Sequence, residues 1–489
     1  MPDTKQRGVS GGPGGAPTVK LPDPVGDCLP VGRAASVLAV VVLAGVLFGY
    51  DQGVISGALL GIEKAFAVAA VALEIVTSWV TLGAMFGSLA GGYVADHFGR
   101  KRALLAAAGL FIVGAVVEAF APDVPVLVLG RLAAGFGVGV AAVAAPLYAA
   151  ELAPAAQRGR FVSSYQLAIT IGIFVAYFVD EALAGPGGWR AMLGVSALAG
   201  VLLALAVLIA VESPRWFAKV GRPDDARRTL VALGAGDEAD ARLAAIEASL
   251  RAEHETPSWA DVFASRWRTP LEIGLGLAVL QQITGINAII YYSDEIFAAA
   301  GFTTPAAQTE ATTWAIGGVN VLSTFIAIAF IDRLGRRPLL LAGLIGMGLS
   351  LAAVGFAFWQ SQVGGGGHNA SLGVVTLAAL VVFIVSFAFS LGPVTWTVIN
   401  EIYPGEIRGR AVAVATATNW GAAFLVSEFF LSIVKAIGQA YTFWLFAAFC
   451  AFGLVWVYVG VPETRCRSLE EIERSWSRTP GAASKLQRS

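Results

Sequence analysis

The chain has 489 residues, of which 56% are hydrophobic and only 14% are charged, and its net charge is −1. Soluble globular proteins carry about 25% charged residues, so this composition excludes a soluble enzyme and a disordered chain and indicates a protein that crosses a membrane many times. The three cysteines and three histidines have no metal-ligand or disulfide spacing, so we expect neither a metal site nor a cofactor, and the near-zero net charge argues against nucleic-acid binding.

Twelve stretches are apolar and long enough to cross a hydrocarbon core of about 30 Å as helices of roughly 20 residues. A tail at 1–33, rich in glycine and proline, precedes them and is predicted to be disordered and cytoplasmic. Six stretches form an N-terminal half at 34–211 and six a C-terminal half at 269–461, before a second cytoplasmic tail at 462–489. The predicted spans are 34–61, 72–95, 103–121, 124–149, 161–184, 190–211, 271–298, 310–331, 337–359, 372–398, 410–436 and 439–461.

The segment 212–268, between the two groups of six, has a different composition. It contains PDDARRTLVALG and DEADARLAAIEASLRAEHE, in which charged and apolar residues alternate at helical spacing. Pro223 followed by Asp224 and Asp225 suits the first turn of a helix, because proline tolerates that position and the acids complement the helix dipole. We expect short amphipathic helices under the membrane domain; the alternative is a flexible linker.

The distribution of basic residues predicts the orientation. If both termini are cytoplasmic, the outer loops hold only Lys64, Arg190 and Lys435, and one arginine, Arg131, lies within a span. The remaining 29 Lys and Arg residues then lie on the cytoplasmic side, as the positive-inside rule requires. We therefore expect a multi-pass protein of the plasma membrane with both ends inside the cell.

The two halves repeat each other at three places. ADHFGRKRALL (95–105) reappears as IDRLGRRPLLL (331–341), ELAPAAQRGR (151–160) as EIYPGEIRGR (401–410), and VESPRW (211–216) as VPETR (461–465). The copies follow the second, fourth and sixth span of each half. Duplicated charge clusters in a chain of six plus six spans are typical of transporters with parallel repeats, whose halves rock about a central site.

These repeated charges are candidates for a gate. An acid and an arginine seven residues apart can bridge neighbouring helix ends and hold them together in one conformation only; the alternative is a purely topogenic charge. The predicted gating charges are Asp96, Arg100, Glu151, Arg158, Arg160, Glu212 and Arg215 in the first half, and Asp332, Arg336, Arg337, Glu401, Arg408, Arg410 and Glu463 in the second.

The motifs FGYDQGVISGALL, GRLAAGFGVG, ELAPAAQRGR, ESPRW, QQITGINAIIYY, GPVTW, ATNW and PETR occur in this order. With them, the chain resembles the sugar porters of the major facilitator superfamily over 34–475, and most of all the bacterial proton-linked monosaccharide symporters of the galactose, arabinose or glucose type. The resemblance implies an all-α membrane protein with twelve transmembrane helices in two six-helix repeats. It also implies a monosaccharide and a proton as partners, and a monomer. The 26 arginines against 7 lysines fit a bacterial source.

Asp51 lies in the middle of the first span, between Gly49 and Gly53. A carboxylate at that depth costs roughly 2.5–3.5 kcal/mol on insertion scales, so it marks a functional site. The resemblance implies that Asp51 is the proton-coupling acid and that Arg131 faces it. The alternative is a structural ion pair without proton turnover. Two further acids at membrane depth, Glu118 and Glu428, receive no role from the sequence.

Amides and aromatic residues in apolar spans are the sugar-site candidates, since a sugar needs hydrogen bonds for its hydroxyls and a flat wall for its ring. On an unbroken helix Gln282 and Asn287 lie about 140° apart, so both face one cavity only if the helix unwinds near Gly285. Alternatives are helix–helix hydrogen bonding for the amides and packing for the tryptophans. The resemblance places in the pocket Gln166, Gln281, Gln282, Asn287, Tyr291, Asn320, Trp396, Asn419 and Trp420.

One departure from the family pattern lies next to this site. The family often has Tyr-Tyr-Ala-Pro after the span-seven asparagine, whereas this chain has Tyr291-Tyr292-Ser293-Asp294. Losing the proline is expected to change the bend of that helix.

The sequence as a whole predicts proton-coupled import of a monosaccharide, such as the hexoses glucose or galactose, by alternating access. The alternatives are a sugar or polyol uniporter for a pentose or myo-inositol and a sugar sensor that transports nothing; no catalytic set supports an enzyme.

Overall fold

The computed structural model describes residues 29–154, 158–185, 187–252, 259–363, 370–403 and 407–463. Within them, twelve helices are long and apolar enough to cross a membrane, so the twelve predicted spans are confirmed. The N-terminal half contains α1 (Val31–Phe66), α2 (Ala70–Phe98), α3 (Arg100–Ala119), α4 (Val124–Leu152), α5 (Arg158–Ala182) and α6 (Gly188–Ile209).

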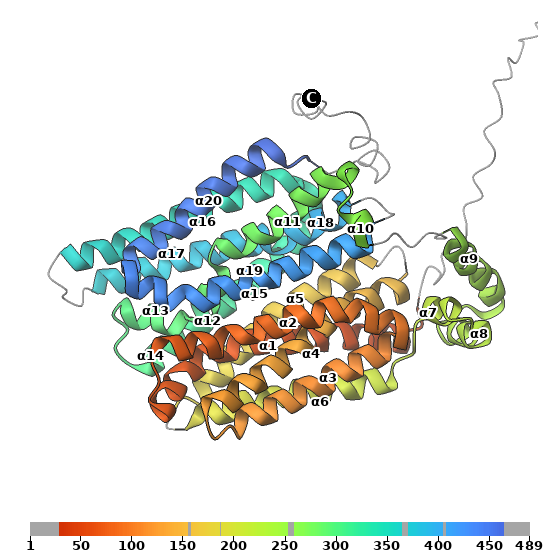
Figure 1. Cartoon of the computed structure of the whole chain (residues 1–489), viewed down its shortest axis with the longest axis horizontal. Helices are drawn as coiled ribbons and strands as arrows, with labels where there is room; N and C mark the ends of the chain where they lie inside the picture. Colours follow the sequence, from red (N-terminus) through yellow and green to blue (C-terminus); the bar gives the residue numbers. More distant parts are fainter. Residues whose placement is uncertain are drawn as a thin grey trace, which may run out of the picture.

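The C-terminal half lies beside the first as a second bundle (Figure 1). Its helices are more interrupted. The six spans of this half comprise α11 (Arg268–Ile283) continued by α12 (Ile286–Tyr291) and α13 (Ser293–Ala299), α14 (Pro305–Ala311) continued by η3 (Thr312–Gly318) and α15 (Val319–Leu334), α16 (Arg336–Val363), α17 (Ala370–Phe389) continued by α18 (Leu391–Ile402), α19 (Arg408–Ile437) and α20 (Gln439–Gly460).

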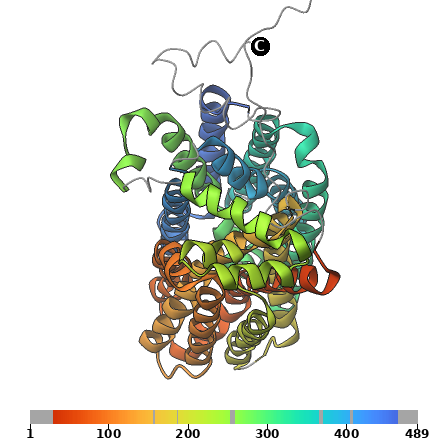
Figure 2. The ribbon, with the colours of Figure 1, turned by 90° about the vertical axis from the view of Figure 1, so that its right-hand side faces the viewer.

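Between the halves, the predicted amphipathic helices are present as α7 (Pro214–Lys219), α8 (Pro223–Ala232), α9 (Ala239–Ala252) and α10 (Trp259–Val262). Helix α8 begins at Pro223 with Asp224 and Asp225 in its first turn, as expected. Figure 2 looks onto the end of the bundle that these helices cover. We call it the linker end, and the opposite end, where α1 ends and α2 begins, the far end.

The first helix is longer than its predicted span. It begins at Val31, three residues before the predicted start, and continues to Phe66, a total of 36 residues. At 1.5 Å per residue, such a helix is about 54 Å long, which exceeds the hydrocarbon core of about 30 Å. The apolar pattern delimits the part in the membrane, whereas the helix itself continues beyond it at both ends. The predicted tails lie largely outside the described residues.

Glycines allow the helices of the first half to approach closely. A Cβ added at Gly49 of α1 would lie 1.9 Å from the carbonyl oxygen of Ile169 on α5, and one at Gly135 of α4 would lie 2.0 Å from that of Val80 on α2. Side chains are excluded at both places. Contacts of this kind between small residues are what holds helices together in a membrane, where no hydrophobic force acts between them.

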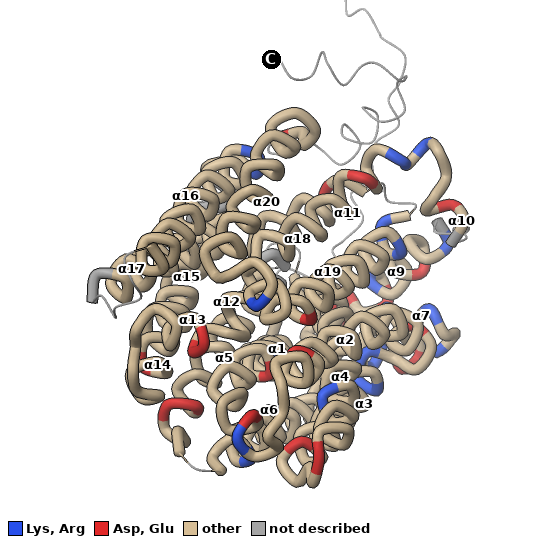
Figure 3. The backbone as a smooth tube through the Cα atoms, turned by 60° about the vertical axis from the view of Figure 1, so that its left-hand side comes forward, with Lys and Arg blue, Asp and Glu red and all other residues tan. Residues whose placement is uncertain are grey.

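Charged residues are scarce along the long helices and numerous at the linker end, where Lys and Arg gather around α7, α9 and α10 (Figure 3). The few charges inside the bundle therefore stand out. They belong to α1, α3 and α4, at the level of Asp51, and to the far end of the interface between the halves.

Candidate functional site

Three charged side chains meet in the middle of the N-terminal half. Nη1 of Arg131 lies 2.9 Å from Oδ1 of Asp51 and 3.7 Å from Oε2 of Glu118, and Nε of Arg131 donates a hydrogen bond to the carbonyl oxygen of Val76 at 3.2 Å. Arg131 is 0%, Glu118 1% and Asp51 3% exposed. One guanidinium thus faces two buried carboxyl groups, and we call these residues the charge triad.

No partner for Glu118 was predicted from the sequence, although its position at membrane depth marked it. Its location follows from a tight contact between α3 and α4. A Cβ at Gly130 would lie 2.7 Å from Cγ of Glu118, and one at Gly114 would lie 2.5 Å from the backbone nitrogen of Ala134. These two glycines let α3 lie directly against α4, which brings Glu118 beside the residue after Gly130, Arg131.

A network of amide side chains occupies the facing part of the C-terminal half. Oε1 of Gln282 accepts a hydrogen bond from Nδ2 of Asn287 at 2.8 Å. Nε2 of Gln282 donates to Oδ1 of Asn419 at 3.2 Å, and Nδ2 of Asn419 donates to Oε1 of Gln281 at 2.8 Å. Gln281 in turn donates to the carbonyl oxygen of Leu391 at 2.8 Å. Each amide is at most 6% exposed.

The network depends on a break in span seven. Helix α11 ends at Ile283 and α12 begins at Ile286, and between them Gly285 has φ +90°, which favours glycine. The break turns Gln282 and Asn287 toward each other, so the predicted unwinding near Gly285 is confirmed. A second break follows at Tyr292, between α12 and α13.

Gln52 connects the two clusters, although it was not among the site residues predicted from the sequence. It is 8% exposed, and its Nε2 donates to Oη of Tyr291 at 3.2 Å and to Oδ1 of Asn287 at 3.5 Å. Because Gln52 follows Asp51 in the chain, one residue separates the charge triad from the amide network. Its position could have identified it, because Gln52 is an amide directly after the acid Asp51 in an apolar span.

The remaining predicted pocket residues have other environments. The ring of Trp420 lies 5.1 Å from that of Phe48 on α1, tilted by 52°, so it faces the other half. Asn320 is 4% exposed, and Gln166 and Trp396 are half-buried. In the described part of the chain, none of these last three side chains hydrogen-bonds to the network.

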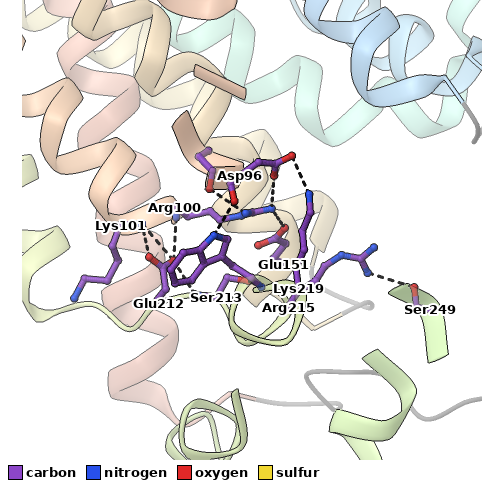
Figure 4. A network of polar contacts seen from close by, with 11 residues as sticks. Asp96, Arg100, Lys101, Glu151, Glu212, Ser213, Arg215, Lys219 and Ser249 are labelled. Atoms are coloured by element: carbon purple, nitrogen blue, oxygen red, sulfur yellow. Dashed lines mark hydrogen bonds and ion pairs between the residues drawn. The ribbon is translucent and has the colours of Figure 1, made fainter. Parts of the chain in front are cut away.

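The repeated charge motifs form two matching clusters at the linker end. In the first half, Nη2 of Arg100 lies 2.7 Å from Glu151 and 3.1 Å from Asp96. Glu212 accepts hydrogen bonds from the backbone N–H groups of Arg100 at 3.1 Å and Lys101 at 3.1 Å (Figure 4). It therefore caps the N-terminus of α3. Burial raises the pKa of Glu212, although these hydrogen bonds act in the opposite direction.

The second half repeats this geometry. Nη2 of Arg336 lies 2.9 Å from Glu401. Glu463 accepts from the backbone N–H groups of Arg336 at 3.0 Å and Arg337 at 3.1 Å, so it caps α16 as Glu212 caps α3. In each half, the acid after the fourth span therefore pairs with the arginine after the second span: Glu151 with Arg100, and Glu401 with Arg336.

The other predicted gating charges have other environments. Arg408 donates to the carbonyl oxygen of Tyr403 at 3.1 Å, and Arg215 donates to Ser249 at 3.4 Å. Arg160 is exposed. The side chains of Arg158 and Asp332 lie outside the described residues, so the expected Glu151–Arg158 bridge stays a prediction.

Hydrogen bonds cross between the halves at the far end. Glu74 of α2 accepts from the backbone N–H of Ser432 on α19 at 2.6 Å, and Ser78 donates to Glu428, which gives Glu428 a partner in the other half. Further bonds run from Tyr177 to Ile290 and from Thr313 to Tyr177. The far end is therefore closed in this conformation.

Comparisons with known proteins agree with this architecture. The family described as "Sugar (and other) transporter" matches residues 37–476. The galactose-proton symporter of Escherichia coli K12 is 41% identical over 436 residues, covering 88% of this chain and 92% of that protein. The arabinose-proton symporter of Bacillus subtilis strain 168 is 35% identical over 442 residues, covering 89% and 93%. The xylose transporter XylE from E. coli, solved in a partially occluded inward open conformation, has a TM-score of 0.78 and 30% identity, with 89% of this chain and 100% of that chain covered.

Proposed function

Because this chain belongs to the sugar transporter family, whose members are transporters and not enzymes, we propose that it imports a monosaccharide together with a proton across the plasma membrane. A hexose such as glucose or galactose is the proposed substrate. The single observation that carries the proposal is the buried contact of 2.9 Å between Asp51 and Arg131 in the middle of the bundle. Relatives named galactose-proton and arabinose-proton symporters support it.

In the proposed mechanism, Asp51 binds and releases the transported proton. A buried carboxylate is tolerated when a guanidinium balances it. Glu118 also faces Arg131, so the charge triad is electrically balanced when one of its two acids is protonated. Movement of Arg131 toward Glu118 leaves Asp51 without its counter-ion and favours its protonation.

The proposed sugar site is the amide network, together with Gln166, Tyr291, Asn320, Trp396 and Trp420. Its amides hydrogen-bond to one another, so sugar hydroxyl groups can take over these bonds at little net cost. A hydroxyl that takes the place of Gln52 at Asn287 or Tyr291 frees a side chain directly beside Asp51. Gln52 is therefore the proposed link between sugar binding and proton binding.

Alternating access supplies the proposed transport cycle. The far end, closed by hydrogen bonds between the halves, is proposed to face outward, and the linker end, which carries most of the basic residues, to face the cytoplasm with both termini. The charge clusters at Glu151 and Glu401 are proposed to act at that end as gates. The same proposal divides the chain into tails at 1–33 and 462–489, halves at 34–211 and 269–461, and a linker at 212–268.

A pH electrode in a lightly buffered, energy-depleted suspension of cells that express the protein tests this function. Single monosaccharides and polyols are added in turn. We expect prompt alkalinisation with one of them, absent in the Asp51→Asn variant, which identifies both symport and the substrate. Uptake of radiolabelled sugar without alkalinisation would instead identify a uniporter, and binding without uptake a sensor.

A further inference from the structure

A second group of acids, in which Asp180 is buried and Asp294 is partly buried, lies at the far end of the interface between the halves. Asp180 comes from α5 and Asp294 from α13, and they contact α1 at the neighbouring residues Gly57 and Ser56. Oδ2 of Asp180 accepts a hydrogen bond from the backbone N–H of Gly57 at 3.3 Å, and the backbone N–H of Asp294 donates to Oγ of Ser56 at 3.3 Å. Ser56 and Gly57 are consecutive residues of α1, so the two acids meet the same turn of that helix. Closing the far end therefore brings together acids from opposite halves.

The site is closely fitted around Asp180, which is 1% exposed. A Cβ at Gly57 would lie 2.5 Å from Cβ and 2.8 Å from Oδ2 of Asp180, so only glycine allows α1 to lie against this side chain. On the other half, Oδ1 of Asp294 accepts from the hydroxyl group of Thr312 at 2.5 Å. The backbone N–H of Gly57 thus holds one oxygen of Asp180, and the hydroxyl group of Thr312 holds one oxygen of Asp294.

Nothing described at this place balances the negative charge. Within the described residues, no ion pair includes Asp180, Asp294 or the neighbouring Glu295, and one oxygen each of Asp180 and Glu295 is buried without a hydrogen-bond partner. The other titratable groups that act on these acids are themselves acids or phenols: Tyr50 and Glu63 from α1, Tyr177 from α5 and Glu295 from α13.

The basic residues Arg190 and Lys64, at the same end of the bundle, form no hydrogen bond or ion pair with these acids in the described part of the chain. Arg190 donates to the carbonyl oxygen of Ala119 at 3.0 Å and stacks 4.3 Å above the ring of Trp189, while Lys64 is exposed. Asp51 differs from these acids, because it has the guanidinium of Arg131 at 2.9 Å as a counter-ion. A buried carboxylate without a counter-ion becomes neutral by binding a proton.

We propose that Asp180 and Asp294 form a second proton-binding site, which takes up a proton from water as the far end closes and returns it as the far end opens. The new O–H bond forms on a carboxylate oxygen of the pair, where the orphaned Oδ1 of Asp180 is available. Opening separates the acids and exposes them to water, which stabilises the ionised form. The inference rests on the rocking motion in the proposed function, but it requires neither sugar nor Asp51.

Cysteine labelling of the purified full-length protein in detergent tests this site without sugar. The reporter is Thr313→Cys, at a position that is 0% exposed and hydrogen-bonded across the halves to Tyr177, in a background in which Cys28, Cys450 and Cys466 are replaced by serine. Labelling by a water-soluble maleimide is measured between about pH 5.5 and about pH 8.5 and divided by the labelling of an exposed control, Ala65→Cys, which corrects for the chemistry of the thiol.

We expect the corrected labelling to rise with pH, by at most about tenfold per pH unit for each proton released. The double variant Asp180→Asn with Asp294→Asn should stay weakly labelled throughout, because neutral amides mimic the protonated acids. Asp51→Asn alone should keep the rise. If the double variant does not fold, as judged by gel filtration, each single variant should shift the rise to higher pH.

Three results would overturn the proposal: labelling that is independent of pH in the parent protein, an unchanged rise in the asparagine variants, or loss of the rise in Asp51→Asn alone. Sugar-induced alkalinisation is measured separately. A failure of the labelling prediction therefore leaves sugar–proton coupling through Asp51 standing, and a failure of that coupling leaves the labelling result standing.

Discussion

The two halves of the molecule hold their central polar groups in different backbone settings. In the described part of the N-terminal half, each span is one continuous helix, and the groups at its centre are charged: Asp51, Glu118 and Arg131. In the C-terminal half, span seven breaks at Gly285, span ten breaks at Ser390, and the central groups are neutral amides.

The difference has a physical reason. A buried charge requires a partner at a fixed position, and packed, uninterrupted helices hold that position. Amides can exchange partners among themselves and with a ligand, and an interrupted helix has backbone freedom to adjust around it. Span eight also contains a π-helical turn, η3, a feature often found at functional sites. In the proposed function, the rigid half therefore holds the coupling acid Asp51, and the adaptable half holds the amide network of the sugar site.

Removing the guanidinium should produce the largest effect. Arg131→Ala leaves Asp51 and Glu118 buried without a counter-ion, which costs about 3–5 kcal/mol for a buried pair. We expect a strongly lowered unfolding temperature in detergent and loss of uphill transport. Adding Asp51→Asn and Glu118→Gln to Arg131→Ala should restore much of the unfolding temperature but not the transport. Equal stability of Arg131→Ala and the parent protein would show that the charge triad is not held as described.

The break in span seven should be next in importance. Gly285→Ala places a Cβ at φ +90° and 2.9 Å from the ring of Phe446, and backbone strain of this kind costs about 1–3 kcal/mol. We expect weaker sugar binding together with a lower unfolding temperature. Gly109→Ala is the matched control, because a Cβ there has nothing within 4 Å. If both variants bind sugar like the parent protein, the break does not shape the sugar site.

The amide network should show a smaller and more specific effect. Gln282→Ala removes the side chain that joins Asn287 to Asn419, and we expect about tenfold weaker sugar binding, equivalent to about 1.4 kcal/mol. Sugar-free labelling should change little, and the unfolding temperature should fall less than in Arg131→Ala because no charge is left without a partner, which separates this variant from those of the charge triad. The sugar affinity is measured by isothermal titration calorimetry, with the substrate identified in the pH-electrode experiment. An unchanged affinity would show that Gln282 is not part of the sugar pocket.

Much of this comparison could be predicted from the sequence, for reasons that particular residues illustrate. Hydropathy locates the spans because a bilayer core imposes one length on all of them. Gln282 and Asn287 fall on different faces of an intact helix. Because both are amides suited to the same sugar site, they indicated a break at Gly285 that would let them face one cavity. The repeated motifs likewise indicated equivalent places in the two halves, and Glu212 and Glu463 do make the same cap.

Apart from the facing of Asp51 and Arg131, which the family resemblance implied, the sequence did not predict the pairings between helices. Glu118 reaches Arg131 only because Gly114 and Gly130 allow α3 and α4 to touch, and no spacing along the chain records that crossing. The meeting of Asp180 with Asp294 depends in the same way on how the two halves close. The position of a polar residue within an apolar span indicates that it is buried. Its partner, however, depends on the packing of segments that are far apart in the sequence.

The smallest effects should come from the linker end, where the halves differ in exposure. The side chains of Arg100 and Glu151 are 4% and 7% exposed, whereas those of Arg336 and Glu401 are 13% and 26% exposed. Water screens the second pair more, so Glu401→Gln should cost under about 1 kcal/mol. Glu151→Gln leaves the more buried guanidinium of Arg100 with Asp96, at 3.1 Å, as its charged partner, and should cost somewhat more, about 1 kcal/mol. Thermal unfolding in detergent at low and high salt measures both, and salt should reduce only the effect at Glu401. An equal loss in the two variants would show that the two charge clusters are equivalent in energy as well as in geometry, and that the difference between the halves is confined to the membrane.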